Sequence, residues 1–210
     1  MTISLKLLDT NNQIQKEIYK QLAKELNKLV RKNNPKVTRT LRGYIENWVL
    51  ESPEVSSLLA QGLKGSLNAR FGLIPGSAVS AVNAIASSVA NATQINVKEI
   101  NRNLSGTIEF NFQSQDFANL LALPEGHQLS EEGIDLHWLD WLLTKGDSII
   151  IQGYYYDPRG LGRSGGGTMS LGGTFRVPPE FSGTPDDNFI TRVFRGKEKV
   201  LQNILSNLLS

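Results

Sequence analysis

The chain contains no cysteine, only two histidines and no long hydrophobic run. Without cysteine, neither a disulfide nor a thiolate metal site can hold the fold together. No apolar segment approaches the ~20 residues that a membrane-spanning helix needs. The first residues also lack the apolar region of a secretory signal peptide. These absences predict a globular protein that depends on a buried apolar core.

Neither positive nor negative charge is present in large excess. The net charge of the 210 residues is +2, and lysine and arginine are spread along the chain. A nucleic-acid surface needs concentrated basic side chains. The densest basic group, from Lys28 to Arg42, fits cations at a helix C-terminus that face solvent. The charge pattern therefore does not favour nucleic acid as the main partner.

Apolar spacing predicts helices in the first 92 residues. From Ile14 to Val30, apolar residues recur every three or four positions, so we expect one stripe to face a core. Pro35 should end this helix, because proline cannot continue the hydrogen-bond ladder. Further helices are expected over 37–50, over 53–59 behind a Ser52 N-cap, and over an Ala- and Ser-rich segment at about 74–93.

Alternating apolar residues predict strands in the second half. These strands are expected at 94–100, 104–112, 147–156 and 167–178, with an apolar helix at 134–146. A terminal helix is expected at about 189–208, with Asp186, Asp187 and Asn188 as its cap. We predict an α+β fold in which long N- and C-terminal helices pack on a mainly antiparallel sheet of about four strands, with an extended Gly-rich hairpin. A single domain over 1–210 is expected, with a helical part at 1–92 and the sheet and C-terminal helix at 93–210.

The segment GLGRSGGG at 160–167 matches two catalytic patterns. Its glycines match the dinucleotide-binding pattern G-x-G-x-x-G, and Gly162, Ser164 and Gly166 match the hydrolase pattern G-x-S-x-G. Both patterns need a helix directly after the loop, whereas a strand is expected here. No histidine follows Ser164 to serve as its base in hydrolase order. We interpret the segment as the tip of a β-hairpin, and a serine hydrolase using Ser164 is the weaker alternative.

Metal chemistry has one candidate group, Asp135, His137 and Asp140. On a helix, residues two and three apart do not share one clean face. We therefore interpret Asp135 as a helix N-cap and His137 as a partly packed side chain. The sequence therefore predicts no metal, no cofactor and no catalytic residue.

The predicted hairpin combines aromatic and basic residues. Tyr154, Tyr155 and Tyr156 precede Arg159 and Arg163. Such side chains are enriched at protein interfaces, and they also stack on nucleic-acid bases. We favour a protein contact, with a nucleic-acid-binding module as the alternative. Because the loop is rich in glycine, we expect an adjacent subunit to order it.

Four segments of the C-terminal half resemble virion structural proteins of tailed bacteriophages with myovirus-type genomes. These are WLDWLL at 138–143, RSGGGTM at 163–169, VPPEFSGT at 177–184 and NFITR at 188–192. The resemblance covers residues 135–195. It implies a non-enzymatic structural protein of the neck, of the tail-completion or tail-terminator kind, that joins head to tail.

The resemblance also implies partners and a location. The chain is expected to form a sixfold or twelvefold homo-oligomeric ring in the virion, after synthesis in the cytoplasm of a bacterial host. It would contact neighbouring connector, neck or tail proteins, with non-specific DNA proximity in the lumen and no membrane; a baseplate position is the alternative. The expected interface residues are Tyr155, Arg159, Arg163, Ser164, Met169, Phe181, Asn188 and Arg192.

Overall fold

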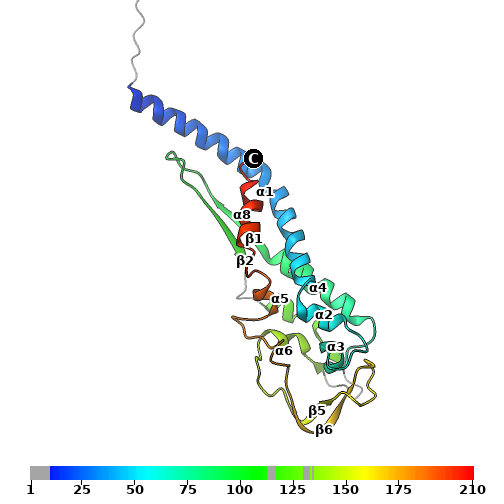
Figure 1. The fold of residues 1–210 in the computed structure, drawn as a ribbon. Helices are drawn as coiled ribbons and strands as arrows, with labels where there is room; N and C mark the ends of the chain where they lie inside the picture. Colours follow the sequence, from blue (N-terminus) through cyan, green and yellow to red (C-terminus); the bar gives the residue numbers. More distant parts are fainter. Residues whose placement is uncertain (1–9, 113–116, 130–132, 134) are drawn as a thin grey trace, which may run out of the picture. The chain divides into compact units, whose positions relative to one another are not determined.

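The computed structural model describes residues 10–112, 117–129, 133 and 135–210 (Figure 1). Contacts group the chain into two compact units. The first unit comprises Met1–Leu41, Gln94–Asn111 and Lys199–Ser210, and the second comprises Arg42–Thr93 and Phe112–Glu198. The single domain expected from the sequence stays a prediction. None of the helices in the described ranges is long and apolar enough to span a membrane.

Helix α1 (Asn11–Leu50) continues through Pro35, so the expected helix end at this proline is wrong. Proline removes one ladder hydrogen bond and costs about 3 kcal/mol inside a helix. That cost is offset by apolar side chains that remain buried after the proline at a regular spacing of four. They are Val37, Leu41, Ile45 and Val49.

We expect Gly43→Ala to stabilise the protein by about 0.5–1 kcal/mol, because alanine loses less backbone entropy than glycine inside a helix. A Cβ added at Gly43 meets no heavy atom within 4 Å. Urea denaturation of both proteins would measure the change in the free energy of unfolding. A destabilised variant would contradict the uninterrupted helix over this position.

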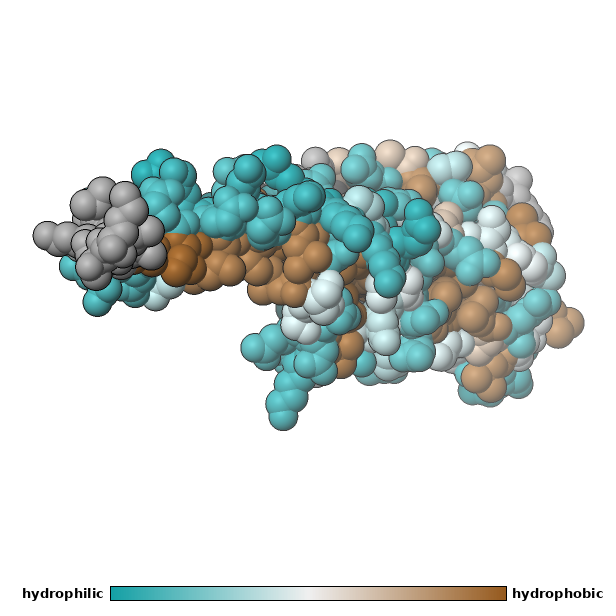
Figure 2. All heavy atoms as spheres, turned by 90° about the horizontal axis from the view of Figure 1, so that it is seen from above, coloured by the Kyte–Doolittle hydropathy of each residue, from teal (hydrophilic) through white to brown (hydrophobic). Residues whose placement is uncertain are grey.

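Only part of the apolar stripe of α1 faces a core as expected, because Val30 is buried whereas Ile18 and Leu22 are largely exposed. In the first unit, 51% of Ile18 and 45% of Leu22 is exposed. Figure 2 shows hydrophobic atoms along one face of the helix beside the grey N-terminal residues, with hydrophilic atoms on the opposite face. The helical period was predicted correctly, but among the described residues the chain leaves this part of its stripe largely uncovered.

The first unit also contains a hairpin and the C-terminal helix. Strands β1 (Thr93–Lys98) and β2 (Thr107–Phe112) pair with each other. The side chain of Asn27 fixes the hairpin to α1, donating to the Ile100 carbonyl at 2.9 Å and accepting from the Ile100 amide at 2.8 Å. Helix α8 (Glu198–Ser206) is followed by Leu208, whose carbonyl accepts from Asn33 Nδ2 at 3.3 Å.

The expected sheet of about four strands is wrong, although the fold mixes helix with small antiparallel sheets as predicted. The described strands form three separate pairs. These are β1–β2, β3 (Gln128–Leu129) with β4 (Asp135–Leu136), and β5 (Ile151–Asp157) with β6 (Thr168–Phe175). In β5 and β6, exposed residues follow one another without strict alternation, so this ribbon does not present one buried face.

The core of the second unit is helical and aromatic. Trp138 stacks on Phe71 with ring centroids 5.8 Å apart, and Trp141 meets the edge of Phe71 and of Phe175 at the same separation. The remaining elements of this unit are α2 (Pro53–Leu59), α3 (Leu67–Arg70), α4 (Ser77–Ala92), α5 (Ala118–Leu121), the 3-10 helix η1 (Pro124–Gly126), α6 (Trp138–Leu143) and α7 (Phe189–Arg192).

The terminal helix expected at 189–208 is interrupted. It forms α7 and α8, with Gly196 between them at a φ of 73°. A left-handed residue cannot continue a right-handed helix, and glycine adopts that conformation at little steric cost. The expected cap before α7 is correct, because the Asn188 side chain accepts from the backbone of Ile190 and Thr191.

Candidate functional site

The Gly-rich loop between β5 and β6 packs on its own chain. Gly62 donates its amide hydrogen to the Ser164 carbonyl at 3.1 Å. The Tyr156 hydroxyl donates to the Gly166 carbonyl at 2.7 Å and accepts from the Gly65 amide at 2.6 Å. The loop therefore contacts residues 60–72 of the same unit. The expected ordering of the loop by an adjacent subunit stays a prediction.

Glycine is needed at two positions of the loop because backbone atoms approach each other closely there. A Cβ at Gly162 would lie 2.0 Å from the Gly167 carbonyl oxygen. A Cβ at Gly166 would lie 2.6 Å from Ala69 Cβ and 2.8 Å from the Leu63 carbonyl oxygen. These glycines let the loop fold on itself and against segment 60–72.

Neither catalytic pattern has its required surroundings. The loop is flanked by β5 and β6, as predicted, and no helix follows it directly. Only 2% of Ser164 is exposed, and its Oγ accepts a hydrogen bond from the Gly166 amide at 3.4 Å. A nucleophilic serine needs a neighbouring base and access to a substrate. Among the described residues, both histidines instead contact Asp135.

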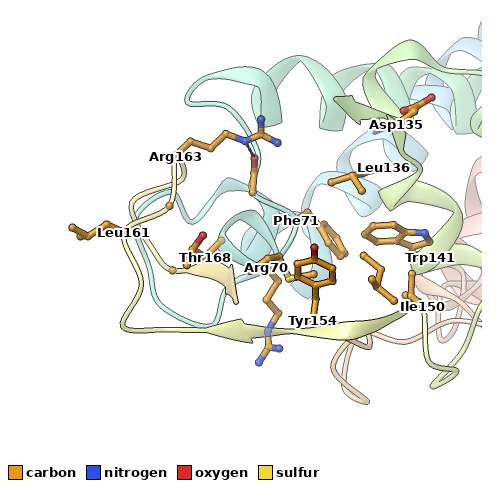
Figure 3. A pocket seen from close by; sticks show the side chains of 16 residues that line it. Arg70, Phe71, Asp135, Leu136, Trp141, Ile150, Tyr154, Leu161, Arg163 and Thr168 are labelled. Atoms are coloured by element: carbon orange, nitrogen blue, oxygen red, sulfur yellow. Dashed lines mark hydrogen bonds between the residues drawn. The ribbon is translucent and has the colours of Figure 1, made fainter. Parts of the chain in front are cut away.

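A cavity of about 630 Å³ lies beside the loop (Figure 3). The rings of Phe71, Trp141 and Tyr154 lie together along its wall, whereas Leu161 points away from it. The Arg163 side chain extends from the loop and is hydrogen-bonded through its Nε to the Gly72 carbonyl and through its Nη1 to the Leu129 carbonyl at 3.0 Å. The guanidinium is thus engaged by backbone oxygens of its own chain.

The eight residues expected at an interface fall into two groups. Tyr155 and Arg159 are exposed on the β5–β6 ribbon, and Met169 and Phe181 are half-buried. The other four, Arg163, Ser164, Asn188 and Arg192, hold hydrogen bonds within the second unit. The role of all eight at an interface stays a prediction. A nucleic-acid contact at this loop would rely on Arg159, which is exposed, because the guanidinium of Arg163 already donates to backbone carbonyls.

Asn188 is fully buried and connects three segments. Its Oδ1 caps α7, accepting from the Ile190 amide at 3.1 Å and from the Thr191 amide at 3.2 Å. Its Nδ2 donates to the Thr184 carbonyl at 2.8 Å and to the Leu143 carbonyl at 3.4 Å. This side chain therefore holds the end of α6 against the start of α7.

Arg192 forms an ion pair with Glu54, which sequence reasoning did not identify. Arg192 Nη1 lies 3.1 Å from Glu54 Oε1, and only 4% of Glu54 is exposed. Burial raises the pKa of this carboxyl, while its backbone hydrogen bond and Arg192 act in the opposite direction. Arg192 also binds Asp187, with 2.8 Å between Nε and Oδ1.

Both histidines of the chain meet at Asp135. Asp135 Oδ2 lies 3.1 Å from His127 Nδ1 and 3.4 Å from His137 Nε2. The hydrogen bond with Asp135 raises the pKa of His127, and a second one with the Leu121 carbonyl adds to the effect. The two imidazole centroids are 4.1 Å apart.

This cluster corrects the sequence interpretation of Asp135. The residue lies in β4 and not at a helix N-cap; His137 takes the N-cap position of α6, without a side-chain cap. Asp140 points to a different partner, with its Oδ2 3.2 Å from Lys145 Nζ. Side chains two apart share a face in a strand, so the helical spacing argument did not apply here.

The β3–β4 register explains why His127 joins the cluster. Gln128 pairs with Leu136 and Leu129 pairs with Asp135, so the next pair in the same register is His127 with His137. A hairpin expected at this point in the sequence would have placed the two histidines opposite each other.

Comparison with family models, with curated proteins and with solved structures finds no match for the chain.

Proposed function

We propose that this chain is a non-enzymatic structural subunit of a tailed-phage virion and forms an oligomeric ring in the neck that joins head to tail. The observation that carries the proposal is the set of four segments between Trp138 and Arg192 that resemble myovirus-type virion proteins. Three of them lie at α6, at the Gly-rich loop with the start of β6, and at α7, all within one compact unit.

Two exposed surfaces, on different elements, support assembly. One is the apolar stripe of α1 around Ile18 and Leu22, and the other is the exposed face of the β5–β6 ribbon with Tyr155 and Leu171. A ring subunit contacts its two neighbours through two different patches, so it needs two such surfaces. Exposed apolar patches of this kind are typical of interaction sites.

The oligomeric state tests the proposal. Light scattering on the purified chain should give a mass six or twelve times that of one chain. Replacing Ile18 and Leu22 with aspartate should reduce this mass to that of a monomer, because a carboxylate buried in an apolar interface costs several kcal/mol, about 3 or more. Lys24→Asp, on the exposed polar side of the same helix, is the matched control and should leave the ring intact.

Immunogold microscopy of purified virions would then locate the chain. Label at the head–tail junction is the expected result, and label at the tail tip would instead support the baseplate alternative. A chain that stayed monomeric at all concentrations and was missing from virions would refute the proposal.

A further inference from the structure

The two imidazoles and the carboxylate of the His127–Asp135–His137 cluster converge on one point. The chain has two histidines in all, and both contact the same oxygen, Asp135 Oδ2. One ligand atom from each of the three residues lies within 4.8 Å of the other two. All three belong to the second unit, so the cluster is formed within one compact part of the chain.

Both ring nitrogens of His127 face hydrogen-bond acceptors. Its Nε2 lies 3.2 Å from the Leu121 carbonyl oxygen, which can only accept. Its Nδ1 lies 3.1 Å from Asp135 Oδ2, which is also an acceptor. A neutral ring has one proton for these two positions, and when Nε2 carries it the lone pair of Nδ1 faces the carboxylate. Two acceptors at this distance repel each other unless a cation or a second ring proton lies between them.

The distances suit a metal ion at this point. Zinc binds imidazole nitrogen and carboxylate oxygen at about 2.0–2.2 Å, so neighbouring ligand atoms of a tetrahedral site lie about 3.3–3.5 Å apart. The distances from Asp135 Oδ2 to His127 Nδ1 and His137 Nε2, 3.1 Å and 3.4 Å, are close to this separation between ligand atoms. The bond from His127 Nε2 to a backbone carbonyl is the support that metal-binding histidines usually have behind them.

We propose that His127 Nδ1, Asp135 Oδ2 and His137 Nε2 bind a divalent cation of the zinc type. Two imidazoles and a carboxylate form a donor set that suits zinc and its neighbours in the first transition row, and three protein ligands leave a position for water. The side chains of Asp135 and His137 are about half exposed, and His127 and His137 line a hollow of about 260 Å³. Solvent can therefore supply the remaining ligand.

The ion would crosslink and stabilise a short two-stranded sheet. Among the described residues, strands β3 and β4 share two residue pairs, Gln128 with Leu136 and Leu129 with Asp135. Short two-stranded pairs are marginally stable by themselves. The ion would join residue 127, just before β3, to β4 and to the start of α6. This inference does not depend on a place in the virion, so either proposal can fail without the other.

Zinc titration of the full-length chain tests the proposal. The protein should carry no polyhistidine tag and should first be stripped with a chelator. Isothermal calorimetry should then show one zinc ion bound per chain. In ¹⁵N-edited NMR, both imidazoles should shift together, His127 with the pattern of Nδ1 ligation and His137 with that of Nε2 ligation. Cobalt(II) should give visible absorption bands with the same stoichiometry.

Single substitutions identify the ligands. His127→Gln, Asp135→Asn and His137→Gln should each weaken zinc binding by about tenfold or more, because each removes one donor atom. Asp140→Asn is the control, since Asp140 pairs with Lys145 outside the cluster, and it should leave the affinity unchanged. His137 is exposed at the surface, so its variant should fold and keep the test informative.

Three outcomes would overturn the inference. If zinc at millimolar excess shifted the NMR signals of neither imidazole, a second ring proton, and not a metal ion, would account for the contact between His127 and Asp135. If Asp140→Asn weakened binding as much as His127→Gln, the ligand set would be a different one. If only one imidazole shifted, the ion would bind a surface histidine and not this cluster.

Discussion

Replacing Arg192 with methionine is expected to lower the free energy of unfolding by about 3–5 kcal/mol, because the substitution leaves a buried carboxylate without its partner. Glu54 is 4% exposed, and Arg192 Nη1 lies 3.1 Å from its Oε1. Arg192 also donates to the Ser182 carbonyl and to Asp187. The variant thus removes several contacts between α2, α7 and the segment before α7.

The cost of Arg192→Met should depend on pH. Burial already raises the pKa of Glu54, and losing the guanidinium should raise it further. A carboxyl with a raised folded-state pKa binds more protons in the native state, so its contribution to stability is present in acid and is lost as pH rises through that pKa. The difference between variant and wild type should therefore be small in acid and grow towards neutral pH.

Urea denaturation across this pH range measures both effects. Arg195→Met is the matched control, because Arg195 makes an exposed ion pair with the same Asp187, 3.1 Å away, and should cost about 0.5 kcal/mol or less. Adding Glu54→Gln to Arg192→Met should recover part of the loss. A pH-independent cost, or one equal to that of Arg195→Met, would contradict the buried ion pair.

Gly162→Ala is expected to lower the free energy of unfolding by about 2–3 kcal/mol through overpacking. The added Cβ would lie 2.0 Å from the Gly167 carbonyl oxygen and 3.2 Å from Thr168 Cα. Both are backbone atoms, which cannot rotate aside as a side chain would. The loop would then have to move away from segment 60–72, which breaks contacts such as the Gly62–Ser164 hydrogen bond.

Trypsin cleavage after Arg163 reports on the loop alone. Cleavage should be faster in Gly162→Ala than in wild type, because protease access needs a released backbone. Leu161→Ala is the control at the neighbouring position. Leu161 is fully exposed, so its replacement should change neither the cleavage rate nor the urea midpoint. Equal behaviour of the two variants would mean that the tight contact at Gly162 does not hold the loop.

Local chemistry is what the sequence could predict. Ser52 followed by Pro53 predicted the start of α2, and Ser52 Oγ does accept from the Val55 amide at 3.3 Å. Asn188 predicted the start of α7 in the same way. The strands on both sides of the Gly-rich loop were also predicted correctly. For both caps the deciding contact lies within a few residues of the signal, so the local sequence contains both partners.

The candidate site required contacts that the sequence does not reveal. His127 and His137 are ten residues apart, and only the β3–β4 pairing brings them to one carboxylate. Glu54 and Arg192 are separated by 138 positions, and no local pattern marks them as partners. Charged side chains at helix ends usually face solvent. The spacing of charged residues in the sequence therefore does not indicate that Glu54 and Arg192 form a buried ion pair.

The sequence by itself determined the helical period of α1, the caps of α2 and α7 and the approximate positions of the strands around the Gly-rich loop. The tertiary structure decided which of these faces are covered. It carried α1 past Pro35, because burial of Val37 and Leu41 outweighs one lost hydrogen bond, and it left Ile18 and Leu22 exposed on the same helix. Period is a property of neighbouring residues, whereas burial depends on segments that are distant in the chain.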